Sequence, residues 1–238
     1  MFQIRTYSLL LTTALFLGGL SVPVPAVAQD VPLEITADQA LEWNQTAKTY
    51  TARGNAKAQQ GDFSVSGDTL TAFYEGKNNS TSDLNKVTSE GHVVILSGQA
   101  DNADRAEGTK AIYDITGSVI TLTGDPSNRP KVTHGKDVLV ADEIKVFMNG
   151  QEMERAEAVG SVQISTSGEQ KASGDKAIYT KATNIAELVG TVKIMQGFNW
   201  IEGDYAKMNL TTKVSTITGQ KNRPRVKGIF YPSSGKKK

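Results

Sequence analysis

The sequence has no cysteine, little aromatic content and only two histidines. Without cysteine, disulfides and thiol chemistry are excluded, so stability has to come from apolar burial and backbone pairing. Aromatic residues make up 7% of the 238 residues. The charges nearly cancel, with 26 Lys and Arg against 25 Asp and Glu. This balance argues against a general binder of nucleic acid or of anionic surfaces.

Long apolar runs are confined to the N-terminus, where residues 1–28 carry the three parts of a secretory signal. Arg5 supplies the positive charge, Leu9 to Leu20 the apolar stretch, and Ala26-Val27-Ala28 the small-residue cleavage pattern. The apolar stretch is shorter than the roughly 20 residues of a membrane-spanning helix. We therefore expect a cleaved signal peptide and an exported mature chain.

The chain repeats itself with a unit of about 30 residues. Three segments align without a gap: AEGTKAIYDITGSVITLTGD from Ala106, ASGDKAIYTKATNIAELVGT from Ala172, and IEGDYAKMNLTTKVSTITGQ from Ile201. The segment around Gly67 gives half of a fourth copy. Such a repeat predicts stacked units that bury a shared apolar surface.

Within each unit, apolar and polar residues alternate with a period of two, as expected for strands. Val192 and Ile194 share one face with Leu188, whereas Lys193 and Lys207 face the other way. One-sided alternation is typical of antiparallel sheet. The sequence therefore predicts an all-β fold of about 14–16 short antiparallel strands, with the repeated glycines at bulges or bends.

The endings LTGDPSNRPKV, from Leu122, and ITGQKNRPRV, from Ile217, are nearly the same. We interpret both as turn segments that end a group of hairpins, and not as a binding motif. In each, proline presets the turn before a strand, and the preceding arginine, Arg129 or Arg223, lies outside that strand.

No pattern of reactive groups indicates an enzyme. His92 follows a repeat glycine at a position where the equivalents are Ser161 and Thr191, which predicts a surface residue, and His134 falls in a turn without a patterned partner. Acidic pairs lack the spacing of a calcium loop, and no glycine pattern forms a phosphate cradle. We expect no catalytic residues, no metal and no cofactor.

The aromatic residues have two interpretations, either the lining of a channel for an apolar ligand or ordinary sheet core. A closed sandwich would pack them against each other, whereas an open one would leave a gap. The residues concerned are Trp43, Phe63, Tyr74, Tyr113, Tyr179 and Trp200.

Taken together, these features resemble the OstA-like family of lipopolysaccharide-transport proteins. The resemblance rests on the signal, the opening LEITADQALEW from Leu33, the GDKAIY-type units, the GDP element at Gly124 and the closing RPRVKGIFYP from Arg223. It implies a twisted β-jellyroll over residues 29–232, followed by a basic tail at 233–238. That jellyroll would open like a V in cross-section and hold the acyl chains of lipopolysaccharide between its sheets.

In this family, lipid contacts are inward-facing strand residues, so they carry over to this chain only by face. The expected lipid-binding residues are Val93, Ile95, Tyr113, Val162, Ile164, Tyr179, Leu188, Val192, Ile194, Met208 and Leu210.

The resemblance also implies end-to-end assembly in the periplasm, the last strand of one copy pairing with the first strand of the next. The partners would be lipopolysaccharide (lipid A), further copies of the chain, and LptC-like inner-membrane and LptD-like outer-membrane jellyroll domains. The expected edge residues are Leu33, Ile35 and Ala37 at the start, and Val226, Gly228, Phe230 and Tyr231 at the end.

The chain departs from the commoner family pattern by a polar insertion at Asn78–Asp83 and by its basic tail. Three alternatives stay open: a membrane-anchored accessory protein of the same pathway, the periplasmic domain of the outer-membrane insertion protein, and an exported structural or adhesive β-repeat protein with a closed core.

Overall fold

The computed structural model describes residues 32–75, 84–98, 104–150, 152–166, 170–219 and 226–231. The predicted signal peptide, the insertion Asn78–Asp83 and the tail at 233–238 lie outside these ranges. Every regular element in the described part of the chain is a strand: β1 (Glu34–Thr36), β2 (Ala40–Asn44), β3 (Thr49–Gln60), β4 (Phe63–Tyr74), β5 (Leu84–Ser97), β6 (Asp104–Asp114), β7 (Val119–Thr123), β8 (Lys131–His134), β9 (Asp137–Val140), β10 (Glu143–Asn149), β11 (Glu152–Ser165), β12 (Gln170–Thr180), β13 (Ile185–Gln196), β14 (Asn199–Asn209), β15 (Val214–Thr218) and β16 (Lys227–Ile229).

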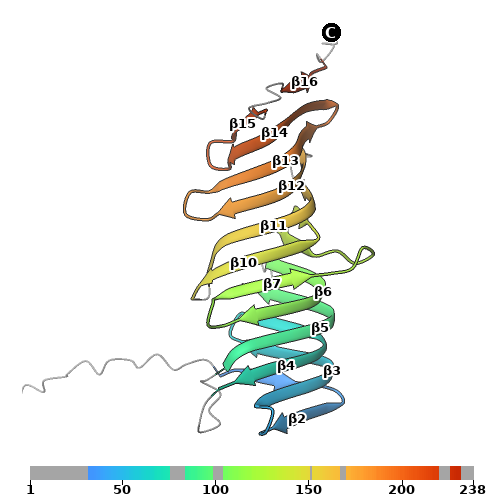
Figure 1. The fold of residues 1–238 in the computed structure, drawn as a ribbon, viewed down its shortest axis with the longest axis vertical. Coiled ribbons are helices and arrows are strands. Elements are labelled where there is room, and N and C mark those ends of the chain that lie inside the picture. Colours follow the sequence, from blue (N-terminus) through green and yellow to red (C-terminus); the bar gives the residue numbers. More distant parts are fainter. Residues whose placement is uncertain are drawn as a thin grey trace, which may run out of the picture. The chain divides into compact units, whose positions relative to one another are not determined.

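These 16 strands form one sheet in which every described pairing is antiparallel. Neighbours in the sheet are mostly neighbours in the chain, and Figure 1 shows them side by side from β2 and β3 (blue) to β14 and β15 (red). The prediction of an all-β fold is confirmed. The prediction of short strands is wrong, because β5 and β11 each run for 14 residues. No helix among the described residues has the length and hydropathy to cross a membrane.

Long strands are possible because each bends at a corner glycine instead of ending there. The ladder register shifts at Gly54–Asn55, Gly91–His92, Gly160–Ser161 and Gly190–Thr191. Both residues of each pair have positive φ, between 43° and 82°, which glycine adopts without a steric penalty. The predicted bulges are thus confirmed, and each divides one strand into two limbs.

Four long strands pair on one side with two short strands, one for each limb. Residues 49–53 of β3 pair with β2, and residues 57–59 pair with β1. In the same way, β6 carries β7 and β8, β11 carries β10 and β9, and β14 carries β15 and β16. The two short strands of such a pair, for example β7 and β8, together take the place of one bent strand, and a turn joins them at the corner.

One apolar cluster lines the inner side of both limbs. It includes Ala52 and Ala56 from the two limbs of β3, and Leu188 and Val192 from the two limbs of β13. All four are at most 2% exposed. Because a two-residue bulge preserves the alternation, the side chains on either side of a corner stay on the inner face.

Candidate apolar binding site

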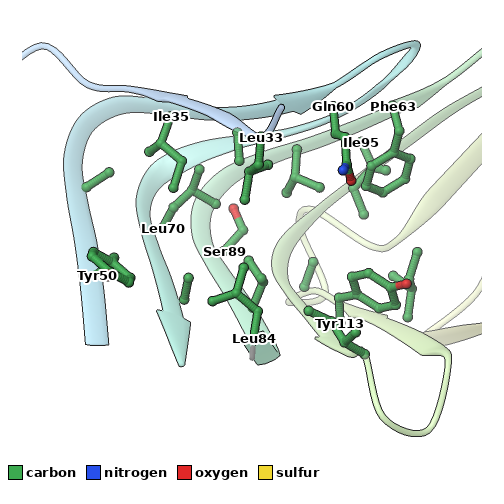
Figure 2. A pocket seen from close by; sticks show the side chains of 18 of the residues that line it. Leu33, Ile35, Tyr50, Gln60, Phe63, Leu70, Leu84, Ser89, Ile95 and Tyr113 are labelled. Carbon is green, nitrogen blue, oxygen red and sulfur yellow. The ribbon is translucent and has the colours of Figure 1, made fainter. Parts of the chain in front are cut away.

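An apolar cavity of about 170 Å³ lies between the limbs, lined mostly by residues of β1 to β7, with Met148 of β10 and Gly150 completing the wall. Figure 2 shows strands bending around it, with Ile35, Gln60 and Phe63 on one limb and Tyr50, Leu84 and Tyr113 on the other. The lining is almost wholly hydrocarbon: Leu33, Ile35, Leu41, Tyr50, Ala52, Ala58, Gln60, Phe63, Val65, Leu70, Ala72, Leu84, Val87, Ser89, Ile95, Ala111, Tyr113, Ile115, Ile120, Met148 and Gly150.

The buried polar group in this lining is satisfied by the neighbouring strand. Ser89 is 1% exposed, and its hydroxyl donates to the carbonyl oxygen of Ser66 at 3.1 Å. The bond needs glycine at position 67, because a Cβ there would lie 2.3 Å from the Ser89 Oγ. With this hydroxyl paired, the wall presents little that would repel hydrocarbon.

Two of the predicted lipid-binding residues, Ile95 and Tyr113, line the cavity. The others lie elsewhere on the sheet: Val93, Val162, Leu188, Val192, Ile194 and Met208 are buried in the core, while Ile164 and Tyr179 are half-buried. The structure brings these residues to one inner face, as their alternation predicts. Whether they touch lipid stays a prediction.

The inward placement predicted for Leu210 is wrong, because β14 ends before it. Asn209 turns the chain, its Oδ1 accepting the backbone N–H groups of Thr211 and Thr212 at 3.0 and 2.9 Å. Leu210 is therefore 47% exposed. Alternation holds only while the strand continues.

Sequence reasoning missed much of the lining in β3, β4 and β5, including Ala58, Val65 and Val87. The signal was present as alternating apolar positions on both sides of Gly54 and Gly67. It was weaker there because small or polar residues interrupt the apolar face.

The aromatic residues divide between the two interpretations. Phe63 and Tyr113 line the cavity, whereas Tyr74 is 2% exposed and accepts a 3.0 Å hydrogen bond from the Trp43 indole. Trp200 lies on the outer face between the ammonium groups of Lys193 and Lys227, 4.7 and 5.0 Å from its ring centre.

Exposed apolar side chains gather at the two ends of the sheet. Among the predicted edge residues, Leu33 and Val226 are 38% and 43% exposed, and Phe230 and Tyr231 exceed 60%. Ile35 and Gly228 lie in the edge strands β1 and β16, and Ala37 directly follows β1. Further exposed residues at these ends, which sequence reasoning did not select, are Leu41, Trp43, Phe198 and Val214.

The outer face carries cross-strand ion pairs that hold carboxylates in their charged form. A hydrogen bond from Lys131 lowers the pKa of Glu107, and Arg105 adds to the effect. Lys176 and Arg155 lower the pKa of Glu157 in the same way. On β14, the Tyr205 hydroxyl donates to the Glu187 carboxylate, and this hydrogen bond raises the pKa of Tyr205 to about 12.

Neither histidine joins a reactive cluster. His92 is exposed, as predicted, with its Nδ1 3.0 Å from the Asp68 carboxylate. His134 ends β8 and does have a partner, contrary to prediction: the Asp104 carboxylate contacts its Nδ1 and raises its pKa. Among the described residues, no three potential ligands converge on a metal site.

Fold and site define a class: an antiparallel β-protein whose bent strands enclose an apolar cleft and leave both ends of the sheet open. The chain belongs to the family described as "LptA/(LptD N-terminal domain) LPS transport protein", which it matches twice, over residues 34–129 and 130–214. The resemblance to OstA-like, LptA-type proteins is thereby confirmed.

Two individual relatives give the range of similarity. An uncharacterized protein of Rhizobium meliloti (strain 1021) is 27% identical over 142 residues, which are 58% of this chain and 72% of that protein. The crystal structure of LptH, the LptA homologous periplasmic component of the conserved lipopolysaccharide transport device from Pseudomonas aeruginosa, is 17% identical. The structural match covers 85% of this chain and 96% of the LptH chain, with a TM-score of 0.25.

Proposed function

We propose that this chain is a periplasmic carrier that binds lipopolysaccharide by its lipid A acyl chains during transport to the outer membrane. The observation that carries the proposal is the cavity between the limbs, lined by residues such as Tyr50, Val87 and Ile95, in a chain of the lipopolysaccharide-transport family. The saccharide would stay in water at the open side of the cleft.

The physical reason for such a carrier is the cost of moving hydrocarbon through water. Each exposed CH₂ costs about 0.8 kcal/mol, so several acyl chains cannot cross an aqueous compartment unprotected. An inner face that stays apolar along the whole sheet lowers this cost at every step.

Binding would require the limbs to separate. The cavity of about 170 Å³ is smaller than the roughly 300–1,000 Å³ of ordinary ligand pockets, so several acyl chains need a wider opening. The free ends of the limbs lie far from the corner glycines, where such opening would meet least resistance. A jellyroll that opens like a V is therefore part of the proposal.

We further propose that copies join end to end and bridge LptC-like and LptD-like jellyroll domains at the two membranes. Support comes from four edge strands, β1, β2, β15 and β16, each paired on one side in the described part of the chain. Export would follow cleavage of the signal at residues 1–28.

The experiment that tests lipid binding uses neighbouring residues of β5. A photo-crosslinking amino acid at Val87, which lines the cavity, should capture lipopolysaccharide from vesicles. The same group at Lys86, whose ammonium lies over the outward-facing Phe73 ring at 4.2 Å, should not. Equal capture at both positions would contradict the inner-face assignment. No capture at either would favour a closed structural protein.

A further inference from the structure

Three described hairpin turns of one limb share a backbone geometry but differ in side chain. This limb carries β1, β8, β9 and β16, and its turns are Gly61-Asp62, Gly135-Lys136 and Gly197-Phe198. Each glycine has a φ of 57° or 58°, as expected at the first position of a two-residue hairpin turn. Because aspartate or lysine completes the same turn elsewhere, the fold does not require an aromatic residue at position 198. Phe198 is nevertheless 85% exposed, more than any other large apolar side chain in the described part of the chain.

A second exposed aromatic ring lies beside Phe198. Tyr231 follows β16 and is 62% exposed. The Phe198 and Tyr231 rings meet edge to face, with 6.3 Å between their centres. The backbone N–H of Tyr231 donates to the Asn199 Oδ1 at 2.8 Å, which holds this ring against the turn. Both rings therefore lie at one tip of the sheet, at the C-terminal end where Figure 1 shows β13, β14 and β16 together.

A third ring and three lysines continue this surface on the outer face. Met195 lies opposite Trp200 on β14 and opposite Lys171 on β12, and residues that lie opposite each other share a face. The ammonium groups of Lys193 and Lys227 lie 4.7 and 5.0 Å from the centre of the Trp200 ring. We name the following six residues the basic aromatic patch: Phe198, Trp200, Tyr231, Lys171, Lys193 and Lys227.

The basic aromatic patch is separate from the apolar cavity and has a local excess of positive charge. None of its six residues lines the cavity. β13 and β14 are paired on both sides, so Lys193 and Trp200 project from the outer face and not from an edge. Glu202 pairs with Lys193 at 2.9 Å and so offsets one of the three positive charges. The near-zero net charge of the whole chain excludes a general binder of anionic surfaces, but not a local one.

We propose that the basic aromatic patch docks the C-terminal end of the protein onto the surface of an anionic phospholipid bilayer. Tryptophan and tyrosine rings favour the level of the lipid headgroups, and lysines near the surface are attracted by anionic lipid. Phe198, at the tip of the turn, would enter the boundary between headgroups and acyl chains. The proposal rests on the proposed periplasmic location and adds a membrane contact to the lipopolysaccharide carrier.

A bilayer fits this surface better than an acidic protein does. An acidic protein would also attract the lysines, but protein interfaces bury their aromatic anchors in matching pockets. Phe198 stands on a protruding turn, and a fluid lipid surface accepts such a ring without a preformed pocket. The combination of a protruding ring with bordering lysines therefore favours lipid.

Vesicle co-sedimentation of the mature chain tests the proposal, with vesicles that contain no lipopolysaccharide. The chain should bind vesicles of phosphatidylglycerol mixed with phosphatidylcholine about tenfold more tightly than vesicles of phosphatidylcholine alone. Added salt should weaken the binding, because it screens the attraction between lysines and lipid. An equal affinity for the two kinds of vesicle, or no binding to either, would overturn the docking.

The aromatic contribution is tested at the turn itself. Phe198→Asp copies the Gly61-Asp62 turn, so the fold should be kept while the affinity for the mixed vesicles falls about tenfold or more. Phe198→Trp keeps an aromatic ring that favours the bilayer interface and should bind as the unaltered chain does. Binding by the aspartate variant equal to that of the unaltered chain would overturn the role of Phe198.

The lysines are tested against a matched pair on the same outer face. K193Q/K227Q should abolish the preference for phosphatidylglycerol. K86Q/K110Q removes the same charge from β5 and β6, where Lys86 lies over the Phe73 ring and Lys110 pairs with a glutamate at 2.7 Å. This control should keep the preference. Equal losses in the two double variants would show a general attraction and overturn the local patch.

The docking and the carrier function fail separately in these experiments. A chain that captures lipopolysaccharide at Val87 but ignores phospholipid vesicles keeps the carrier function and overturns the docking. A chain that binds the mixed vesicles through Phe198 but captures no lipopolysaccharide supports the docking and contradicts the carrier function.

Discussion

The internal joint, where β7 pairs with β10 and β8 with β9, and the open edges of the sheet contain equivalent strands but differ in what they expose. Ile144 at the joint is 1% exposed, whereas its equivalent Leu41 at the N-terminal edge is 63% exposed. Val214 of β15 is 59% exposed, whereas Val119 of β7 is half-buried. The difference comes from a missing neighbour and not from a change in local fold. An apolar open strand is a template for another strand, which is the physical basis of the proposed end-to-end assembly.

The largest effect should follow from truncating the buried member of this comparison. Ile144→Ala leaves a cavity in the joint and should reduce the free energy of unfolding by about 2–5 kcal/mol. Leu41→Ala, at the equivalent exposed position, should change it by no more than about 0.5 kcal/mol in dilute protein. Urea unfolding followed by circular dichroism measures both. Similar losses in the two variants would show that the edge is already covered within one chain.

Removing the arginine from the internal joint should have the next largest effect. Arg129→Ala leaves the Gly160 and Ser161 carbonyls without this donor and should cost about 1–3 kcal/mol of unfolding free energy. Arg53→Ala is the control, since Arg53 makes an exposed ion pair with Glu42 that is worth about 1 kcal/mol or less. Equal effects of the two variants would mean that Arg129 is an ordinary surface charge.

A smaller effect should appear as a dependence of stability on pH. The pKa of Glu157 is lowered, first by its hydrogen bond with Lys176, so its ionised form stabilises the folded state above the unfolded pKa of about 4.3. This stabilisation is lost as the pH falls through the folded pKa. Glu157→Gln should therefore flatten the decline in melting temperature below about pH 5. Glu107→Gln should do the same at the joint, where Lys131 of β8 lowers the pKa of Glu107. If the melting temperature falls with pH equally steeply in both variants and in the unaltered chain, neither carboxylate contributes to the loss of stability in acid.

The smallest effect expected is a change in tryptophan emission at the N-terminal edge. Trp43 is 49% exposed and stacks on Tyr50 with 5.8 Å between ring centres. In a Trp200→Phe variant, Trp43 is the only remaining tryptophan, because the chain has two. Its emission should shift to shorter wavelength as protein concentration rises and β15 of another copy covers β2. A constant spectrum over the association range would place the joint elsewhere.

The sequence predicts the faces of this sheet better than its connections. Alternation places Leu188, Val192 and Ile194 inward, because the period of a strand does not depend on its neighbours. The repeated glycines predict the corners, where both residues of each bulge need positive φ. Neither signal reveals that two predicted strands are limbs of one bent strand, since a bulge and a turn have similar composition.

The site is harder to predict because it depends on separation across the sheet. Val93 and Ile95 have the same parity on β5, yet only Ile95 lines the cavity. Proximity to the corner decides this, because limbs that meet at a bulge leave room only farther along the strand. The contacts of Arg129 are hidden from the sequence for a related reason: its partners Gly160 and Ser161 lie more than 30 residues away in the chain.

Native mass spectrometry of the mature chain after exposure to lipopolysaccharide vesicles tests the central claim most directly. The account predicts a complex whose added mass equals intact lipopolysaccharide, and it predicts that a charge placed on the cavity wall, Val87→Asp, abolishes the complex without unfolding the chain. A folded chain that acquires no lipid mass, or a Val87→Asp variant that binds as well as the unaltered chain, would contradict it.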